Sequence, residues 1–348
     1  MHRSGGQEDR RDASRLIAPA ATVAAMRIWQ SHELGDPLDV LRLEEGDDPG
    51  APGSGQVLVE TTAVGLTFPD VLSCRGEYQV PTKLPYTPGG EIAGVVAAVG
   101  DDVDLAVGTA VAVLGGGLRD KNIVGAGSCF AYPTDALSPA QAAAIPVNYG
   151  TAWFGLHDRA QLQPGETVLV TGAAGGTGTA CIQLAQAAGA TPIAVVGGDE
   201  KAALVRSLGV ELVVDHRRTP EWVDTVREMS GGGVDVAWDA VGGDAFHQVR
   251  RCMAWDGRLL IVGFVGGIAQ APTNHALLKN YAIVGVHWGA SLMRDPESVR
   301  RQMDAVFALA TEGKVAPPVE SVRPFEEAAA AIQAIADRQV TGKAVVTI

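Results

Sequence analysis

The apolar positions of this chain follow two different rhythms. From Met26 to about residue 115, the apolar runs are short, as at 57–60 and 92–97, and glycine, proline or aspartate interrupts them. This spacing is typical of short β-strands joined by turns, so the first half is predicted to be an all-β, barrel-like domain. From about residue 164, strand-like runs alternate with helical stretches. That alternation indicates a parallel sheet with crossover helices, so the fold class is α/β plus β.

Six strands are predicted in the second half, at 167–171, 192–196, 211–214, 234–238, 258–262 and 282–286. The helix after the first of them carries apolar side chains on one face, and Gly189 follows as a C-terminal stop. The side chains on this face, which should lie on the sheet, are Cys181, Leu184, Ala185 and Ala188. The last segment, 341–348, returns to β character after a helix around 325–337. We expect it to rejoin the first domain.

Length and charge narrow the class of protein. The chain has 348 residues, 47% of them hydrophobic, and because single cores stop growing near about 250 to 300 residues, two domains are expected. The formal net charge of −13 repels phosphate backbones and anionic lipids, which argues against nucleic acid and membrane as partners. No stretch reaches the about 18 to 20 uninterrupted apolar residues of a membrane span.

Cysteine usage and the N-terminal composition bear on location. Cys74, Cys129, Cys181 and Cys252 form no C-x-x-C pair, so they are interpreted as ordinary thiols of a reducing compartment. Residues 1–25 mix arginines with acidic residues and lack the apolar core of a signal peptide. We expect a cytoplasmic protein whose first 25 residues are a mobile tail or an over-long start.

A glycine-rich turn, 172–178, joins the first predicted strand of the second half to its helix. Glycines let the backbone approach a pyrophosphate, and a helix N-terminus offers free N–H groups to it. Ala173 replaces a glycine of the strict dinucleotide fingerprint. The order of strand, turn and helix nevertheless favours a dinucleotide site, with a tight turn that holds no ligand as the alternative.

The end of the second strand favours NADPH. An acid there would hydrogen-bond the ribose 2′-hydroxyl of NADH and repel a 2′-phosphate, but the strand ends in Gly197 and Gly198. Asp199 and Glu200 open the next helix, where carboxylates are expected as partners of the helix dipole. Lys201 follows and is a candidate for the phosphate, with a solvated helix charge as the alternative.

Several stretches together resemble one family. They are 64–72, 75–78, 85–94 and 146–153, together with the turn at 171–178. From about Met26 to Ile348 the chain resembles the zinc-free, zeta-crystallin-like quinone oxidoreductases of the medium-chain dehydrogenase/reductase family. The resemblance implies a GroES-like β-barrel domain, a Rossmann domain with a doubly wound parallel sheet, and commonly a homodimer joined through that sheet. The implied division is a tail at 1–25, a GroES-like substrate domain at 26–150, a Rossmann NADPH-binding domain at 151–290 and a segment at 291–348 that rejoins the first domain.

Zinc-containing relatives carry metal ligands at three positions that here hold Thr67, Gly90 and Val147. These residues do not supply the nitrogen and sulfur ligands of a catalytic zinc, so no metal is expected. The stretch between Cys129 and Asp135 is also shorter than the family's usual strand, which predicts a lost strand.

By the same resemblance, Lys201, His216 and Arg338 are expected at the cofactor phosphates, although the family often has tyrosine where His216 stands. Thr67 and Tyr78 are expected nearest the substrate as the catalytic polar residues, although quinone reductases frequently have asparagine at the first position. The other implied NADPH contacts are Asn148, Thr151, Ala173, Gly175, Gly176, Thr177, Gly178, Gly198, Gly263 and Phe264.

The expected function is an NADPH-dependent reductase that passes hydride to quinones or other electron-poor conjugated carbonyl compounds without zinc. Such acceptors spread the arriving negative charge over a π-system, so hydrogen bonds and orientation can replace a Lewis acid. Two alternatives stay open, an enoyl-thioester reductase of the enoyl-CoA type and a non-catalytic NADPH-binding protein.

Overall fold

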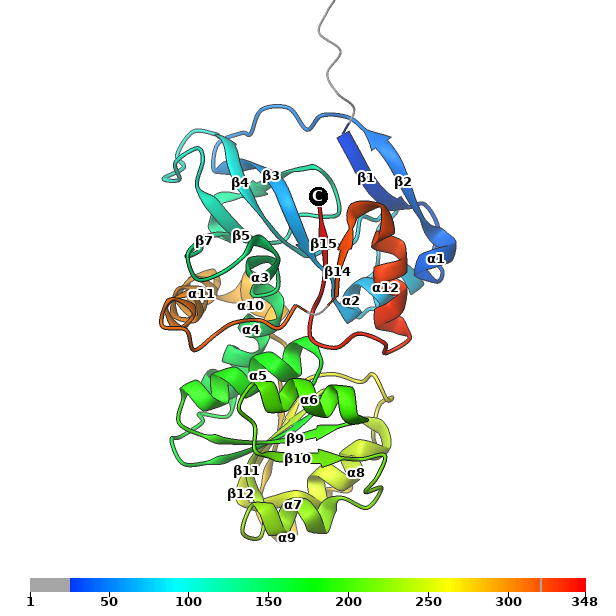
Figure 1. Ribbon diagram of the computed structural model, residues 1–348, viewed down its shortest axis with the longest axis vertical. Helices are drawn as coiled ribbons and strands as arrows, with labels where there is room; N and C mark the ends of the chain where they lie inside the picture. The colour runs from blue at the N-terminus through cyan, green and yellow to red at the C-terminus, as the bar shows by residue number, and fades with distance from the viewer. Residues whose placement is uncertain (1–25, 320) are drawn as a thin grey trace, which may run out of the picture.

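The computed structural model describes residues 26–319 and 321–348. Two sheets organise this part of the chain, one in the upper half and one in the lower half of Figure 1. The expected tail at 1–25 lies outside the described residues.

The lower sheet is wholly parallel. Its strands are β8 (Thr167–Thr171), β9 (Thr191–Val196), β10 (Leu212–Asp215), β11 (Val234–Asp239), β12 (Met253–Ile261) and β13 (Ala282–Gly285). Their order, β10-β9-β8-β11-β12-β13, is that of a doubly wound fold, with the direction of winding reversed between β8 and β11. All six predicted strands are confirmed, although β12 begins at Met253 rather than at residue 258.

Helices cover both faces of the lower sheet in Figure 1. They are α5 (Gly176–Ala187), α6 (Asp199–Ser207), α7 (Val223–Met229), α8 (Gly243–Cys252) and α9 (Thr273–Lys279). The predicted apolar face of α5 is confirmed, because Cys181, Leu184 and Ala185 have no exposed surface. Gly189 has a φ of 79°, a left-handed conformation that ends the helix and that glycine adopts without strain.

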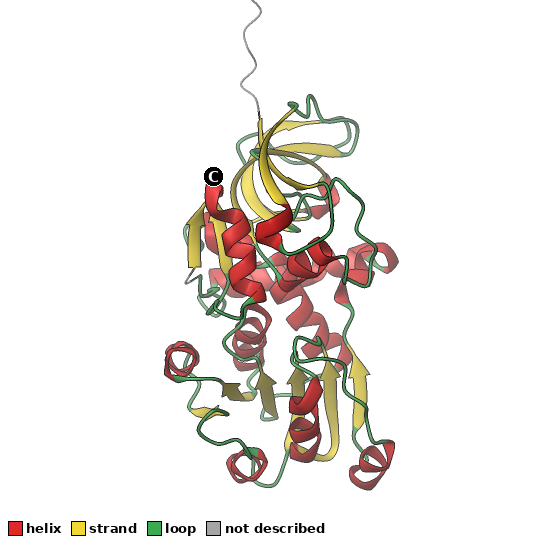
Figure 2. Cartoon of the chain, turned by 90° about the vertical axis from the view of Figure 1, so that its right-hand side faces the viewer, coloured by secondary structure: helices red, strands yellow, loops and turns green. Residues whose placement is uncertain are grey.

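The upper sheet is mostly antiparallel, and its strands curl in the side view of Figure 2. Its strands are β3 (Gln56–Gly65), β4 (Glu91–Val99), β5 (Ala110–Leu114), β6 (Lys121–Gly125), β7 (Cys129–Ala131), β14 (Ser321–Pro324) and β15 (Ala344–Thr347). The order is β14-β15-β3-β4-β5-β7, and β6 also pairs with β3. The strands β1 (Met26–Ser31) and β2 (Leu41–Gly46) form a separate two-stranded sheet.

The predicted loss of a strand between Cys129 and Asp135 is wrong. β7 pairs with β5 in antiparallel register, from Cys129 opposite Val113 to Ala131 opposite Val111. Cys129 and Phe130 are buried, so burial of these two side chains stabilises a strand of only three residues.

The remaining helices lie beside the upper sheet and between the two sheets (Figure 1). They are α1 (Pro37–Val40), α2 (Phe68–Arg75), α3 (Pro139–Ala143), α4 (Pro146–Trp153), α10 (Ser291–Arg294), α11 (Pro296–Thr311) and α12 (Ala328–Ala336). α4 contacts both α5 and α11 and continues into a π-helical turn at Phe154–Arg159. Among the helices of the described ranges, none is long and apolar enough to cross a membrane.

The end of the chain returns to the upper sheet, where β15 pairs with β3. Just before β15, the amide of Gly342 donates a 2.8 Å hydrogen bond to the carbonyl of Ala174, in the glycine-rich turn of the lower half. The C-terminal segment therefore contacts both halves of the molecule. Domain boundaries at residues 150 and 290 stay predictions.

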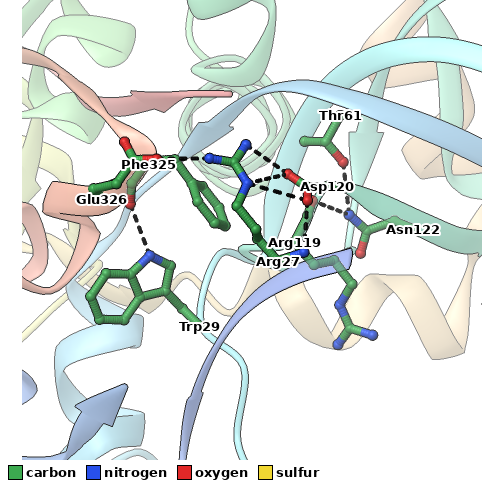
Figure 3. A network of polar contacts seen from close by, with 8 residues as sticks. All are labelled: Arg27, Trp29, Thr61, Arg119, Asp120, Asn122, Phe325 and Glu326. Atoms are coloured by element: carbon green, nitrogen blue, oxygen red, sulfur yellow. Dashed lines mark hydrogen bonds and ion pairs between the residues drawn. The ribbon is translucent and has the colours of Figure 1, made fainter. Parts of the chain in front are cut away.

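Polar contacts hold β1 to the C-terminal segment (Figure 3). The Arg27 guanidinium donates to Asp120 at 2.9 Å and to Glu326 at 2.7 Å. It also lies 4.9 Å above the ring of Phe325, whose carbonyl accepts the indole N–H of Trp29 at 2.8 Å. The first and last parts of the upper half thus form one packed unit.

Candidate functional site

The glycine-rich turn folds tightly between β8 and α5. A Cβ on Gly178 would lie 2.3 Å from the carbonyl oxygen of Gly172, closer than side-chain atoms are found, so only glycine fits there. The first N–H groups of α5 have no acceptor within the helix, and this helix end can hold an anion. Asn148, on α4 and only 5% exposed, lies against Gly176, where a Cβ would meet its Nδ2 at 2.6 Å.

A buried ion pair stands beside this turn. The Lys343 ammonium, one residue after Gly342, pairs with the carboxylate of Glu91 at the start of β4, and neither side chain is more than 4% exposed. The second oxygen of Glu91 accepts the amide of Val147 at 2.7 Å. Burial raises the pKa of Glu91, and the positive charge of Lys343 opposes that rise. The pair joins the start of β4 and the start of α4 to the residue that precedes β15.

Sequence reasoning missed this pair. The run Gly89-Gly90-Glu91 was interpreted only through Gly90, which replaces a metal ligand of the zinc-containing relatives. The sequence did hold one indication of the pair, since Lys343 opens the apolar run at 343–346. A lysine is rarely fully buried without a partner, so a buried acid could have been expected beside it.

Positive side chains gather at the end of β9, where the sequence lacks an acid. The Lys201 ammonium donates to the backbone carbonyl of Arg338 at 3.2 Å. The guanidinium of Arg338 in turn donates to the carbonyl of Val265 at 2.6 Å, across to the loop after β12. The structure therefore brings the Lys201 side chain to the backbone of Arg338, and their shared contact with a cofactor phosphate stays a prediction.

His216 and Arg217 approach the end of β9 from the end of β10. A Cβ on Gly197 would lie 2.7 Å from the Nε2 of His216 and 3.3 Å from the Nε of Arg217. A Cβ on Gly198 would lie 3.2 Å from Nη1 of Arg217. Sequence reasoning missed Arg217, since nothing in the local pattern tells which of several basic residues after β10 turns toward β9.

Asp215 is the acid closest to this cluster in sequence. Its carboxylate accepts the amides of Gly198 and Arg217, each at 3.0 Å. These hydrogen bonds, and the charges of Arg218 and His216, lower the pKa of Asp215. The Asp215 carboxylate therefore stays charged and holds the turn around Gly198 in place, with Arg218 3.5 Å away as its positive partner.

The predicted substrate residues lie just before and just after α2. Thr67 precedes the helix, and its hydroxyl donates to Asp70 at 2.7 Å. Tyr78 is half-buried, and burial, followed by the negative charge of Asp70, raises the pKa of its phenol. Because the Thr67 proton is already donated, Tyr78 is the better hydrogen-bond donor of the two.

The remaining predicted contacts lie on α4 and on the loop after β12. The Thr151 hydroxyl donates to the carbonyl of Val147 at 2.7 Å. Phe264 is 51% exposed, and together with Gly263 it lines an apolar cavity of about 190 Å³. Asp239 borders the same cavity and is only 1% exposed, and it accepts the amide of Gly242 at 3.0 Å.

Two of the three positions of the zinc ligands, Gly90 and Val147, lie beside Glu91. The Glu91 side chain follows Gly90, packs against Gly65 and accepts the amide of Val147. Within residues 26–319 and 321–348, no group of three or more histidine, cysteine, aspartate or glutamate side chains is arranged to hold a metal ion.

Comparison with known proteins defines the class. A zinc-binding dehydrogenase family model matches residues 176–308, and an alcohol dehydrogenase GroES-like domain model matches residues 53–136. The quinone oxidoreductase-like protein 2 homolog of Nematostella vectensis is 38% identical over 327 residues, which cover 92% of this chain and 88% of that protein. The chain therefore belongs to the medium-chain dehydrogenase/reductase family, and the expected resemblance and fold class are confirmed.

Two solved structures that resemble this chain are a quinone oxidoreductase and an enoyl reductase. The quinone oxidoreductase from Thermus thermophilus, also solved in its complex with NADPH, is 34% identical with a TM-score of 0.80 and covers 92% of this chain and 100% of its own. CurK enoyl reductase is 26% identical with a TM-score of 0.83 and covers 93% of this chain and 99% of its own.

Proposed function

We propose that the protein is an NADPH-dependent reductase of quinones or other electron-poor conjugated carbonyl compounds, and that it works without zinc. The observation that carries the proposal is the pair of basic side chains, His216 and Arg217, that lies against Gly197 and Gly198. Lys201 follows on α6 and donates to the backbone carbonyl of Arg338. A 2′-phosphate needs positive partners at this place, and NADH does not.

NADPH, when bound, supplies the hydride. The chain's own residues fit it, since the glycine turn and the N-terminus of α5 offer amide donors for the pyrophosphate. We infer that Tyr78 donates a hydrogen bond to the carbonyl oxygen of an acceptor, since burial and the charge of Asp70 raise the pKa of its phenol, which therefore stays protonated. Solvent can protonate the reduced product, so no dedicated general base is required.

Cofactor titration tests the first part of the proposal. We expect NADPH to bind at least about 10-fold more tightly than NADH, because a charged hydrogen bond contributes about 1.5 to 3 kcal/mol. Lys201→Ala should reduce this preference and leave NADH affinity unchanged. Equal affinities for the two nucleotides in the unmodified protein would refute the phosphate assignment.

Steady-state kinetics test the reaction. With NADPH, we expect reduction of 1,4-benzoquinone or 9,10-phenanthrenequinone to be measurable, while primary-alcohol oxidation stays at background. Alcohol oxidation in this family relies on zinc to stabilise alkoxide, a contribution of several kcal/mol that this chain's ligand positions do not support. Robust alcohol oxidation without quinone or enone reduction would contradict the proposal.

The similarity to an enoyl reductase favours a second candidate, reduction of an enoyl thioester. Parallel assays with a quinone and with an enoyl-CoA, at matched NADPH, separate the two by their kcat/KM. NADPH affinity without turnover on either class would instead indicate a non-catalytic binding protein.

We also propose a homodimer joined through β13, which lies at one edge of the lower sheet. Ile283 on this strand is 40% exposed, and the neighbouring helix α9 has no buried residue, with Leu277 78% and Leu278 66% exposed. An open strand edge beside exposed apolar side chains is typical of a surface that a second chain covers. Light scattering should give twice the mass of one chain, and Ile283→Lys should yield monomers.

A further inference from the structure

The imidazole of His216 is aimed at the end of β9. Its Nε2 is the nearest atom to the position that a Cβ on Gly197 would occupy, at 2.7 Å, while its backbone amide is held by the carbonyl of Val196 at 3.0 Å. The residue is exposed, and no side-chain hydrogen bond or ion pair of His216 occurs among the described residues. Its ring is therefore available to a ligand at this point.

The charged groups around this imidazole come from two places, the end of β10 with the residues that follow it, and the start of α6. From the end of β10, Asp215 faces it and is committed to the amides of Gly198 and Arg217, while Arg218 pairs with Asp199 at 2.6 Å. From the start of α6, Lys201 reaches the carbonyl of Arg338.

Two further groups complete the surroundings. Glu200, on α6, accepts the Thr341 hydroxyl at 3.3 Å, which directs it toward the C-terminal segment. Arg217 places Nε and Nη1 against Gly197 and Gly198. Glu200 is thus directed away from His216, whereas Asp215 stays beside it and holds the amide of Gly198. The positive groups that face Gly197 and Gly198 are His216 and Arg217.

We propose that His216 makes the preference of this protein for NADP(H) over NAD(H) increase as the pH falls, while Arg217 supplies a share of that preference that does not change with pH. The inference rests on the proposed NADPH site. Histidine is the side chain that ordinarily gains a charge between pH 8 and 5, whereas arginine stays charged throughout. A protonated imidazole beside the 2′-phosphate adds one ion pair, and NAD(H) has no group with which to form it.

The phosphate has a pH dependence of its own. A phosphate monoester has a second pKa of about 6 and loses negative charge below it, which weakens binding to every positive partner. This effect is common to the unmodified protein and to its variants. The contribution of His216 is therefore the difference between the two proteins at each pH, not the slope of either one.

Calorimetric titration with NADP⁺ and NAD⁺ at pH 6 and pH 8 tests the proposal, since it reads binding without turnover. The ratio of the two affinities is compared between the unmodified protein and His216→Asn, whose amide does not titrate. At pH 6 the unmodified protein should have a ratio about five-fold higher than the variant, as expected for one exposed ion pair. At pH 8 the two ratios should agree within about two-fold.

Three matched variants sharpen the result. Arg217→Gln should lower the ratio by a similar factor at both pH values. His32→Asn and Arg323→Gln, exposed positions in the upper half that pair with Glu44 and Glu327, should change neither ratio. Thermal melting of each variant checks that it is folded.

The outcomes separate this inference from the proposed function. A clear preference for NADP⁺ whose pH course is the same in His216→Asn would overturn the role of His216 and leave the cofactor assignment intact. An Arg217→Gln effect confined to one pH would overturn the division between the two residues. No preference for NADP⁺ in the unmodified protein at either pH would overturn both this inference and the NADPH site on which it rests.

Discussion

The hydroxyl of Thr67 donates a 2.7 Å hydrogen bond to the carboxylate of Asp70. Asp70 is 3% exposed and also accepts the amides of Thr67 at 2.7 Å and of Gly89 at 2.8 Å. Through these bonds, Asp70 ties the start of α2 to the loop that leads into β4. Thr67, which is expected to lie near the substrate, therefore also stabilises the local fold.

Thr67→Val should therefore lower stability more than catalysis. We expect the free energy of unfolding to fall by about 1.5 to 3 kcal/mol, as for a lost hydrogen bond to a charged group. Turnover with a quinone should fall less than in Tyr78→Phe. Urea denaturation and quinone-reduction kinetics measure the two effects, and a large loss of turnover with unchanged stability would show that the Thr67 hydroxyl acts on the substrate instead.

Tyr78→Phe should lower kcat by about 10-fold or less, for one neutral hydrogen bond. Because the pKa of the Tyr78 phenol is raised above its ordinary value near 10, the donor should persist into alkaline solution and be lost only above about pH 10. In a pH profile of kcat, the unmodified enzyme should decline above that pH, and Tyr78→Phe should lack this decline. If the two pH profiles of kcat are the same, Tyr78 does not take part in the reaction.

Lys343→Met should destabilise the protein strongly, because it leaves the Glu91 carboxylate buried and unpaired. Breaking a buried pair from one side costs about 3 to 5 kcal/mol. The double variant Glu91→Gln with Lys343→Met should recover part of this loss, since no buried charge remains. Equilibrium unfolding of the single and double variants measures the difference, and additive losses would contradict a direct pairing.

Quinone reduction should survive exhaustive chelation, and elemental analysis should find less than one zinc per chain. The reason is that Thr67, Gly90 and Val147 stand where zinc-containing relatives have ligands. Loss of activity on chelation, with recovery on adding zinc, would overturn the metal-free assignment.

The four cysteines should resist thiol reagents in the folded protein. All are buried, and burial raises the pKa of Cys74 to about 12 and that of Cys129 to about 11, so neither is a thiolate at pH 8. A colorimetric thiol assay should detect no fast-reacting cysteine in the native protein and four reactive cysteines after denaturation. Rapid modification of Cys74 in the native state would show that α2 opens.

The pattern along the chain determined the elements and their order. Each of the six parallel strands, the apolar face of α5 and the β character of the last segment follow from local spacing, because strand and helix periodicities depend on neighbouring residues alone. The glycine-rich turn at 172–178 could be predicted equally well, since the glycines within it set its backbone conformation. The three-residue strand β7 was missed, because burial against β5 rather than length or pattern stabilises it.

Only the tertiary structure decided which distant groups meet. Lys343 and Glu91 are 252 positions apart, and neither predicts the other. Arg217 turns toward Gly197 while Arg218 pairs with Asp199, a choice that rests on how β9 and β10 align. The sequence by itself therefore determined the family, the fold and the kind of cofactor to expect, whereas packing between the two sheets decided the partners of each charge, because such contacts depend on atoms brought together only when the whole chain folds.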